Sequence, residues 1–282
     1  MQLIKYHALG NDYLVLDPAG SEVNLTGAQI QRICDRHYGI GSDGLLIGPT
    51  PTPADGCDFG LKLYNPDGNE FEKSGNGLRI FARYLWDTGR VEAKPFTIGT
   101  PGGRVTARVH EGGQRVTVEM GQVSFDSQRI PVAGRPREVL DENLTLGGWS
   151  LRVSCATVGN PHCVVLRNEV SAAEAQSLGP LIENASRFPR RTNVQFLQVL
   201  DRSNVRIEIW ERGAGYTLAS GSSSSAAAAV AHRLGLVDSQ VAVHMPGGVI
   251  DITIGPDWSI TMAGGVTRVC QATVWDEMFG VS

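Results

Sequence analysis

The sequence contains an internal repeat that constrains the fold more than any other feature. Its first landmark is a Gly-Asn pair before an apolar run, which occurs at Asn11 and again at Asn160. A Ser-Gly pair follows 63 residues after Asn11, at Ser74, and 60 residues after Asn160, at Ser220. A Pro-Gly-Gly sequence then comes 27 residues after Ser74 and 26 residues after Ser220. Three landmarks in one order at nearly equal spacing indicate two halves of one design, which we expect to meet near residues 120–150.

The residue pattern predicts mostly short strands joined by Gly, Pro and Asn turns, with fewer helices. One helix is expected over residues 27–38, with Thr26 as its N-cap and Gly39 as its stop, and others follow Gly75, Ser171 and Gly221. Strands are expected at residues 2–9, 13–17, 61–64, 105–110, 115–120, 164–167, 194–199 and 205–210. Because helices do not regularly separate these strands, we predict an α+β fold with mostly antiparallel connections.

Two of the expected helices begin in a way that suits an anion. Ser74 and Ser220 each precede a glycine at a helix start, where N–H groups lack partners and the dipole adds about half a positive charge. If both starts converged on one ligand, two side chains could exchange protons on opposite faces of a carbon next to a carboxylate. The N–H groups would stabilise the charge that builds on that carboxylate. The alternative for each serine is an ordinary N-cap.

Composition narrows the class of partner. The 282-residue chain is 41% hydrophobic and 19% charged, which is typical of a folded protein of one large or two ordinary domains. Its net charge of -4 argues against nucleic acid, and no apolar run approaches the ~20 residues of a membrane span. The first residues show no signal-peptide core, so we expect a cytoplasmic protein. Five scattered cysteines without a Cys-x-x-Cys pair indicate reduced thiols.

Other motifs carry less information. Residues 39–44 match the dinucleotide pattern GxGxxG, but a strand-like run at 45–47 follows where that pattern needs a helix, which excludes it. His162 has no further ligands at metal spacing, so no metal is expected, and it is either a structural histidine or a site residue. Glu211 and Arg212 could bind the ammonium and carboxylate of an amino acid, or could form a solvated pair.

Six motifs together resemble those of a known family. They are Gly10-Asn11-Asp12, Asn65-Pro66-Asp67-Gly68, Ser74-Gly75-Asn76-Gly77-Leu78-Arg79, Gly159-Asn160-Pro161-His162, Arg191-Thr192-Asn193-Val194 and Glu211-Arg212-Gly213-Ala214-Gly215-Tyr216-Thr217. In order and spacing, the chain resembles the diaminopimelate epimerases over nearly its whole length. The resemblance implies an α+β fold of two pseudo-symmetric α/β lobes with a cleft between them. The lobes would be residues 1–125 and 126–282, and the last strand of the chain could pair back onto the first lobe.

The resemblance also implies an activity and a role for each candidate site residue. The activity is inversion of an amino-acid α-carbon without pyridoxal phosphate, metal or other cofactor, and a homodimer is the implied assembly. The distal carboxylate of the substrate would be bound by Asn65, Asn160, Asn193 and Arg212, with Asn11 in the same pocket and Glu211 on an ammonium group. Backbone N–H groups of Gly75, Asn76, Gly221 and Ser222 would hold the reacting carboxylate. We add His162 to these substrate-binding candidates, with Ser74 and Ser220 as the catalytic pair.

Both catalytic positions depart from the family pattern. The family has cysteine where this chain has Ser74 and Ser220, and its usual Cys-Gly-Thr-Gly reads Ser220-Gly221-Ser222-Ser223 here. A thiol has a pKa near ~8.5, which a helix N-terminus lowers, whereas a hydroxyl is far less acidic and is weak without an adjacent base. Thiol-based catalysis therefore does not carry over to this chain.

Three hypotheses remain open. In the first, Ser74 and Ser220 are the two acid/base groups of an amino-acid isomerase, as the related proline racemase group shows Ser or Thr at one of these positions. In the second, Glu72, Lys73 or His162 supplies the base, for a related isomerisation of another substrate. In the third, the chain binds an amino acid without turnover. We favour the first, with diaminopimelate, a lysine and peptidoglycan precursor, as the leading substrate because the distal residues are all present.

Overall fold

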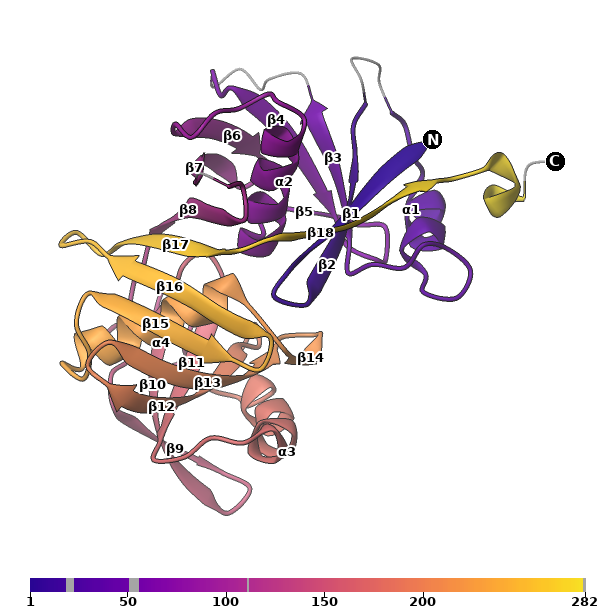
Figure 1. Cartoon of the computed structure of the whole chain (residues 1–282). Coiled ribbons are helices and arrows are strands. Elements are labelled where there is room, and N and C mark those ends of the chain that lie inside the picture. Colours follow the sequence, from indigo (N-terminus) through magenta and orange to yellow (C-terminus); the bar gives the residue numbers. More distant parts are fainter. Residues whose placement is uncertain (19–22, 51–55, 111, 281–282) are drawn as a thin grey trace. The chain divides into compact units, whose positions relative to one another are not determined.

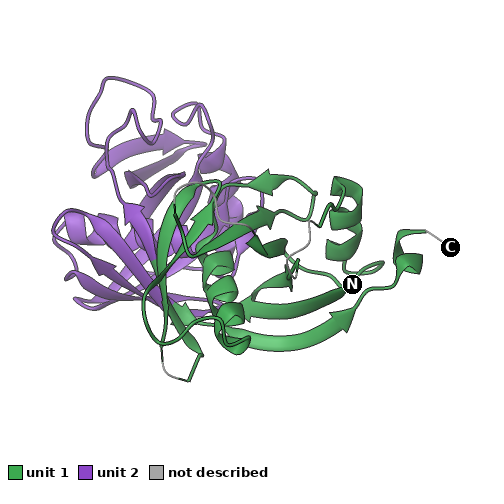
Figure 2. Ribbon diagram, turned by 90° about the horizontal axis from the view of Figure 1, so that it is seen from above, with its two compact units in different colours: residues 1–118, 264–282 green, residues 119–263 purple. Residues whose placement is uncertain are grey.

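The computed structural model describes residues 1–18, 23–50, 56–110 and 112–280. The chain forms two compact units, which Figure 2 shows in separate colours. Unit 1 contains residues 1–118 and 264–282, and unit 2 contains residues 119–263. The sequence-based boundary was residue 125. In the structure the chain leaves unit 1 after Val118 and returns to it at Gly264.

Unit 1 is a sheet with one central and one peripheral helix (Figure 1). Its elements are β1 (Gln2–Ala8), β2 (Asn11–Leu16), α1 (Gly27–Cys34), β3 (Leu45–Thr50), β4 (Phe59–Tyr64), β5 (Glu70–Phe71), α2 (Gly75–Asp87), β6 (Phe96–Thr100), β7 (Gly103–Val109), β8 (Arg115–Gln122), β18 (Thr267–Thr273) and the short 3-10 helix η1 (Asp276–Phe279). The strand order is β18-β1-β2-β3-β4-β6-β7-β8. The pairs β2–β3 and β4–β6 are parallel, and the others are antiparallel.

Unit 2 repeats this arrangement. Its elements are β9 (Glu142–Leu146), β10 (Trp149–Thr157), β11 (Pro161–Arg167), α3 (Ala172–Glu183), β12 (Asn193–Asp201), β13 (Asn204–Glu211), β14 (Gly215–Thr217), α4 (Gly221–Arg233), β15 (Gln240–Met245), β16 (Gly248–Ile254) and β17 (Ser259–Gly265). The strand order is β9-β10-β11-β12-β13-β15-β16. Here β11–β12 and β13–β15 are the parallel pairs.

Matching the two orders strand by strand confirms the internal repeat. Each unit has a parallel pair spanned by a peripheral helix, and a second parallel pair spanned by the central helix. β18 occupies the place in unit 1 that β9 occupies in unit 2, because it pairs antiparallel with β1 as β9 does with β10. The last long strand of the chain therefore completes the first unit.

The central helices are buried on almost every face. α2 packs against β1, β2, β3 and β7, and α4 packs against β10, β11, β12, β13, β15 and β16. In a helix without a solvent-exposed face, every side must carry residues that the surrounding sheet can accommodate. α4 meets this constraint with a run of small residues at 222–229, of which 223–229 are fully buried. The peripheral helices α1 and α3 pack instead on separate apolar clusters.

One sequence-based expectation was wrong, and one feature of the sheets was not anticipated. α1 ends at Cys34 and not near residue 38, because Asp35 adopts an extended backbone and its Oδ1 accepts hydrogen bonds from the N–H groups of His37 and Tyr38, both at 2.7 Å. An Asx turn of this kind competes with the helix for backbone donors. Most strand pairs between described residues are antiparallel, as expected. The parallel pairs were not anticipated, because the two partners of each pair are distant in sequence.

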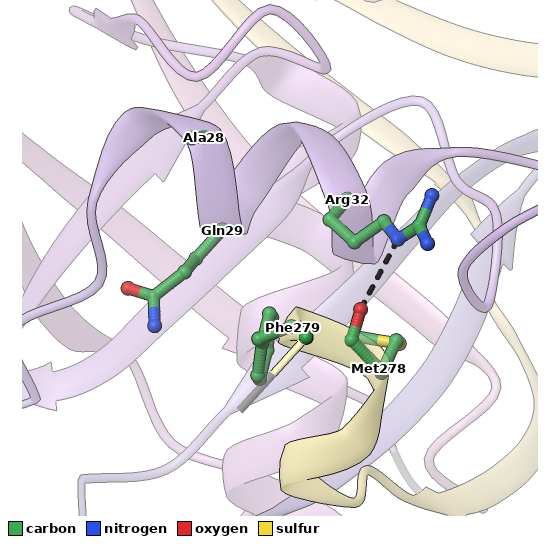
Figure 3. A pocket seen from close by; sticks show the side chains of 6 residues that line it. Ala28, Gln29, Arg32, Met278 and Phe279 are labelled. Atoms are coloured by element: carbon green, nitrogen blue, oxygen red, sulfur yellow. Dashed lines mark hydrogen bonds between the residues drawn. The ribbon is translucent and has the colours of Figure 1, made fainter. Parts of the chain in front are cut away.

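The C-terminal end of the described chain packs on α1. Figure 3 shows Met278 and Phe279 of η1 beside Ala28, Gln29 and Arg32. Arg32 Nε donates to the backbone oxygen of Met278 at 3.1 Å. Met278 and Phe279 also pack on the apolar cluster beneath α1. η1 therefore anchors the end of β18 to unit 1.

Candidate active site

The helices α2 and α4 begin with the same N-cap geometry. Ser74 caps α2 with φ −135° and ψ 123°, and Ser220 caps α4 with φ −146° and ψ 124°. Ser74 Oγ accepts a hydrogen bond from Gly77 N at 3.0 Å, and Ser220 Oγ accepts one from Ser223 N at 3.4 Å. Each helix is 13 residues long. The serine thereby accepts from one N–H group of each helix start. The N–H groups that precede it in the first turn have no intrahelical acceptor, which is the general basis of anion binding at helix N-termini.

A Pro-Gly-Gly turn braces the segment before each capping serine. Gly102 N donates to Glu72 O at 2.9 Å, and Gly247 N donates to Leu218 O at 2.8 Å. Both acceptors lie two residues before the serine of their own unit. A side chain would not fit at residue 102, because its Cβ would lie 2.9 Å from Glu72 O. In each unit, the Pro-Gly-Gly turn thus holds in place the backbone that precedes the Ser-Gly pair.

Topology brings the unit 1 candidates to one end of the sheet. β2 begins at Asn11, and β4 ends directly before Asn65. Since β3 is parallel to β2 and antiparallel to β4, the start of β2 and the end of β4 lie at the same sheet end. Asn76, the second residue of α2, donates from Nδ2 to Asn11 Oδ1 at 2.9 Å. Asn11, Asn65 and Ser74 are all partly exposed there.

Ion pairs fix the hairpin that carries Asn11. Asn11 Nδ2 donates to Asp43 Oδ2 at 2.8 Å. Arg36 pairs with both Asp12 and Asp43 at 2.7 Å, and Lys5 pairs with Asp12 at 2.7 Å. Burial alone would raise the pKa of Asp12, but the hydrogen bonds from Arg36 and Lys5 outweigh it and lower that pKa to about 2. Asp12 is therefore ionised at neutral pH and holds the start of β2 in place.

The unit 2 candidates converge in the same way. Asn160 directly precedes β11, and β12 begins at Asn193. Because these strands are parallel and β13 is antiparallel to β12, the end of β13 at Glu211 and the following Arg212 lie at the same sheet end. Asn160 Nδ2 donates to Ser222 Oγ at 3.4 Å, which joins this edge to the start of α4.

A hydrogen-bonded chain leads from the interior of unit 2 to Ser220. His162 Nε2 lies 2.8 Å from Asn160 Oδ1, and the Oγ atoms of Ser222 and Ser220 are 3.5 Å apart. His162 is fully buried, and desolvation lowers its pKa to about 3, so the ring is neutral at neutral pH. A neutral ring with its proton on Nε2 donates to Asn160 and fixes the direction of that amide. Nearby, Gln195 Nε2 donates to Ser223 Oγ at 3.0 Å.

Asn193 connects the strand ends of unit 2 to one another. Its Nδ2 donates to Pro161 O at 2.8 Å, and its Oδ1 accepts from Arg212 N at 3.0 Å. Asn193 is only 5% exposed, whereas Arg212 is exposed and its Nη1 donates to Arg190 O at 3.1 Å. The structure therefore places Asn193 against the backbone of Arg212.

Glu183, the last residue of α3, holds the turn after β13. Its carboxylate accepts from Trp210 Nε1 at 2.7 Å and from Gly213 N at 3.0 Å, and it pairs with Arg191 at 3.0 Å. The α3 backbone comes close to Trp210, because a Cβ at Gly179 would lie 2.5 Å from that ring. Glu183 is only 5% exposed, and both oxygens of its buried carboxylate have hydrogen-bond partners.

Sequence reasoning assigned no role to Asp43, Arg79, Glu183 and Gln195. Asp43, Glu183 and Gln195 contact the candidate site from distant segments, and Arg79 donates to Asn76 within α2. Arg79 belonged to the motif at residues 74–79 without a role of its own, and Glu183 carried a local signal. An acidic residue in the last turn of a helix is unfavourable beside the negative end of the dipole, so a charge there indicates a tertiary partner.

No group of three or more His, Cys, Asp or Glu residues suited to a metal ion occurs within the described residues. In the same part of the chain, no helix is long and apolar enough to cross a membrane.

Comparison with solved structures defines the class of fold. A hydroxyproline epimerase from Agrobacterium vitis superposes with a TM-score of 0.66 at 16% identity, covering 96% of this chain and 91% of that one. A phenazine biosynthesis protein of the PhzF family from Bacillus anthracis superposes with a TM-score of 0.68 at 18% identity, covering 98% and 99%. The fold is therefore the two-lobed α/β fold of these epimerase and PhzF-type proteins.

Sequence comparison gives the family. The family model for diaminopimelate epimerase matches residues 3–125 and 154–269. "Diaminopimelate epimerase 2" from Nostoc sp. is 54% identical over 281 residues, covering 100% of this chain and 98% of the relative. Diaminopimelate epimerase from Moorella thermoacetica is 38% identical over 275 residues, covering 95% and 97%. The chain belongs to the diaminopimelate epimerase family.

Proposed function

We propose that this chain is an isomerase that inverts one α-carbon of diaminopimelate, from the LL to the meso form, in the cytoplasm. The observation that carries the proposal is the repeated helix start, with Ser74 and Ser220 in the same N-cap geometry. The names and identities of the relatives support the substrate, because they extend over nearly the full length of both chains. The ligand is a small amino acid, and the resemblance alone suggests a homodimer.

In the proposed reaction the two serines act as base and acid, and the protons and electron pairs balance. One serine, as the alkoxide, takes the α-proton, and the C–H electron pair moves toward the carboxylate, whose oxygens gain charge. The hydroxyl of the other serine gives its proton to the opposite face of the carbon. The first serine ends protonated and the second ends as the alkoxide, so solvent exchange must restore the starting state.

The helix starts supply the stabilisation that this reaction needs. The added charge falls on carboxylate oxygens, and N–H groups of Gly75, Asn76, Gly221 and Ser222 are the proposed donors. The N–H groups of Gly77 and Ser223, which donate to the two serine Oγ atoms, act with the helix dipoles to favour an alkoxide over a hydroxyl at each capping serine. This stabilisation of the alkoxide partly offsets the low acidity of a serine hydroxyl.

The distal end of the substrate is assigned to the two sheet ends. Asn11 and Asn65 present amides at the sheet end of unit 1. In unit 2, Asn160 presents an amide and Arg212 presents a guanidinium. We assign Glu211 to an ammonium group. Asn193 and His162, which are buried, act by holding Arg212 and Asn160, respectively.

An isotope experiment tests the function. Incubation with LL-diaminopimelate in deuterium oxide is expected to give meso-diaminopimelate that carries one deuterium at the inverted α-carbon, detected by mass spectrometry and chiral chromatography. Labelled product should precede labelled substrate, because separate bases take and give the proton. If only another amino acid exchanges, the chemistry holds and the substrate is wrong. If no amino acid of a broad panel exchanges while diaminopimelate binds, the chain is a binding protein.

Glu183→Gln is expected to raise KM for diaminopimelate about tenfold, since one charged hydrogen bond to the Arg212 turn is weakened, while kcat stays nearly constant. Steady-state kinetics measure both constants. Glu174→Gln is the matched control, because it breaks an ion pair of the same helix, with Arg167 Nε at 2.7 Å, away from that turn. Equal KM values for the two variants would show that Glu183 does not position the site.

A further inference from the structure

Arg79 is a fully buried arginine whose bonding capacity is mostly unused. It lies in α2, one turn after the helix start, with 0% of its surface exposed. Its Nη2 donates to Asn76 Oδ1 at 2.6 Å. Its Nε and Nη1 have no hydrogen-bond partner among the described residues. A buried guanidinium normally has every nitrogen satisfied, so this one needs an explanation.

The charge of Arg79 is also uncompensated. None of the ion pairs between described residues includes it. Desolvation lowers the pKa of its guanidinium to about 10, which still leaves it protonated at neutral pH. An unpaired buried cation lowers the stability of the folded state. An anion that binds near it therefore gains binding free energy, because it compensates the buried charge.

Arg79 sets the direction of a chain of side-chain amides. Asn76 Nδ2 donates to Asn11 Oδ1 at 2.9 Å, and Asn11 Nδ2 donates to Asp43 Oδ2 at 2.8 Å. Arginine can only donate and an ionised aspartate can only accept, so the two ends allow one orientation of both asparagines. In this orientation, Asn11 and Asn76 each keep a second N–H for a ligand.

The internal repeat shows that packing does not require this arginine. Because α2 and α4 start at equivalent serines and have equal lengths, Arg79 corresponds to Ser225. Ser225 is also fully buried, but its hydroxyl simply donates to Gly221 O at 2.8 Å. A central helix enclosed by this sheet therefore accommodates a small hydroxyl at the same place.

We propose that Arg79 is a positioning residue for the substrate carboxylate. It orients the amides of Asn76 and Asn11, and the carboxylate at the start of α2 neutralises its charge. This inference rests on the proposed function. Arg79 does not touch the reacting atoms, so its effect is expressed mainly in substrate affinity.

Arg79→Met tests the proposal, because it removes the charge and the donor while keeping a long apolar side chain. We expect Kd for meso-diaminopimelate, measured by calorimetry, and KM to rise about 10- to 100-fold, the range for a lost charged hydrogen bond. Arg79→Lys, which keeps the charge and a donor, should recover part of this loss. Arg83→Met is the matched control, one turn further along α2, where it removes the pair with Asp87 at 2.7 Å.

Equal Kd values for Arg79→Met and Arg83→Met, in variants that melt at similar temperatures, would overturn the proposal. If Arg79→Met does not fold, Arg79→Gln decides, since its amide can still donate to Asn76 but carries no charge. That variant should fold and lose at least ~10-fold in affinity, and unchanged affinity would also overturn the proposal. Wild-type binding without turnover would sink only the proposed function, whereas absence of wild-type binding would sink both.

Discussion

Replacing either Ser74 or Ser220 by alanine is expected to lower the rate of diaminopimelate epimerisation by about 10³-fold or more, which is the scale of a lost acid/base group. Each hydroxyl caps a central helix and is the assigned proton carrier of its unit. The measurement is the rate of α-deuterium incorporation into the inverted product.

Ser171→Ala separates catalysis from helix capping. Ser171 caps α3 with the same kind of bond, its Oγ accepting from Glu174 N at 3.2 Å, but it belongs to no candidate site. Loss of any of the three caps should cost about 1 kcal/mol of stability. Activity should fall only for the Ser74 and Ser220 variants. If those two variants keep full activity, the base lies elsewhere, and Glu72 or Lys73 becomes the next residue to replace.

The double change of Ser74 and Ser220 to cysteine is expected to raise kcat/KM at least about tenfold near pH 8, or ~1.4 kcal/mol of barrier. A thiol at a helix N-terminus is largely ionised at that pH, whereas a hydroxyl is not. The N-cap positions, the flanking glycines and the bracing turns are unchanged by the substitution. The pH dependence of kcat/KM measures the effect.

Alkylation provides a second readout for the same variant. Four of the five native cysteines are buried and the fifth, Cys270, is exposed on β18, so iodoacetamide should leave the wild-type activity intact. The double variant should be inactivated, and Ser171→Cys should be labelled without loss of activity. A double variant slower than wild type at every pH would show that the site is built for hydroxyl chemistry.

Local signals in the sequence predicted the helix starts well. All four helices begin within one residue of the expected position, because caps and glycines act over a single turn. The predicted end of α1 was wrong, because the side chain of Asp35 accepts a backbone hydrogen bond that stops the helix. The parallel pairs, such as β2 with β3, were missed because pairing depends on contacts between segments that are distant in sequence.

The residues of the candidate site also fall into two groups, those with a local sequence signal and those without one. Asn11, Ser74, Asn160 and Ser220 could be named from repeated motifs, since each lies next to a glycine of a repeated landmark. Glu183 could not be assigned a role, because its partners Trp210 and Gly213 come from other elements. Arg79 donates to Asn76 of its own helix, but its role depends on the burial that leaves its other nitrogens without a partner among the described residues.

The sequence by itself determined the internal repeat, the family and the residues that start each helix, since these depend on short motifs and their order along the chain. Only the tertiary structure decided which candidate side chains are exposed at the sheet ends and which are buried beneath them. His162 and Asn193 are buried and hold Asn160 and Arg212, and Arg79 brings an unpaired charge beneath the start of α2. The reason is physical, because burial and hydrogen-bond direction depend on which distant segments surround a group, and no local pattern encodes that environment.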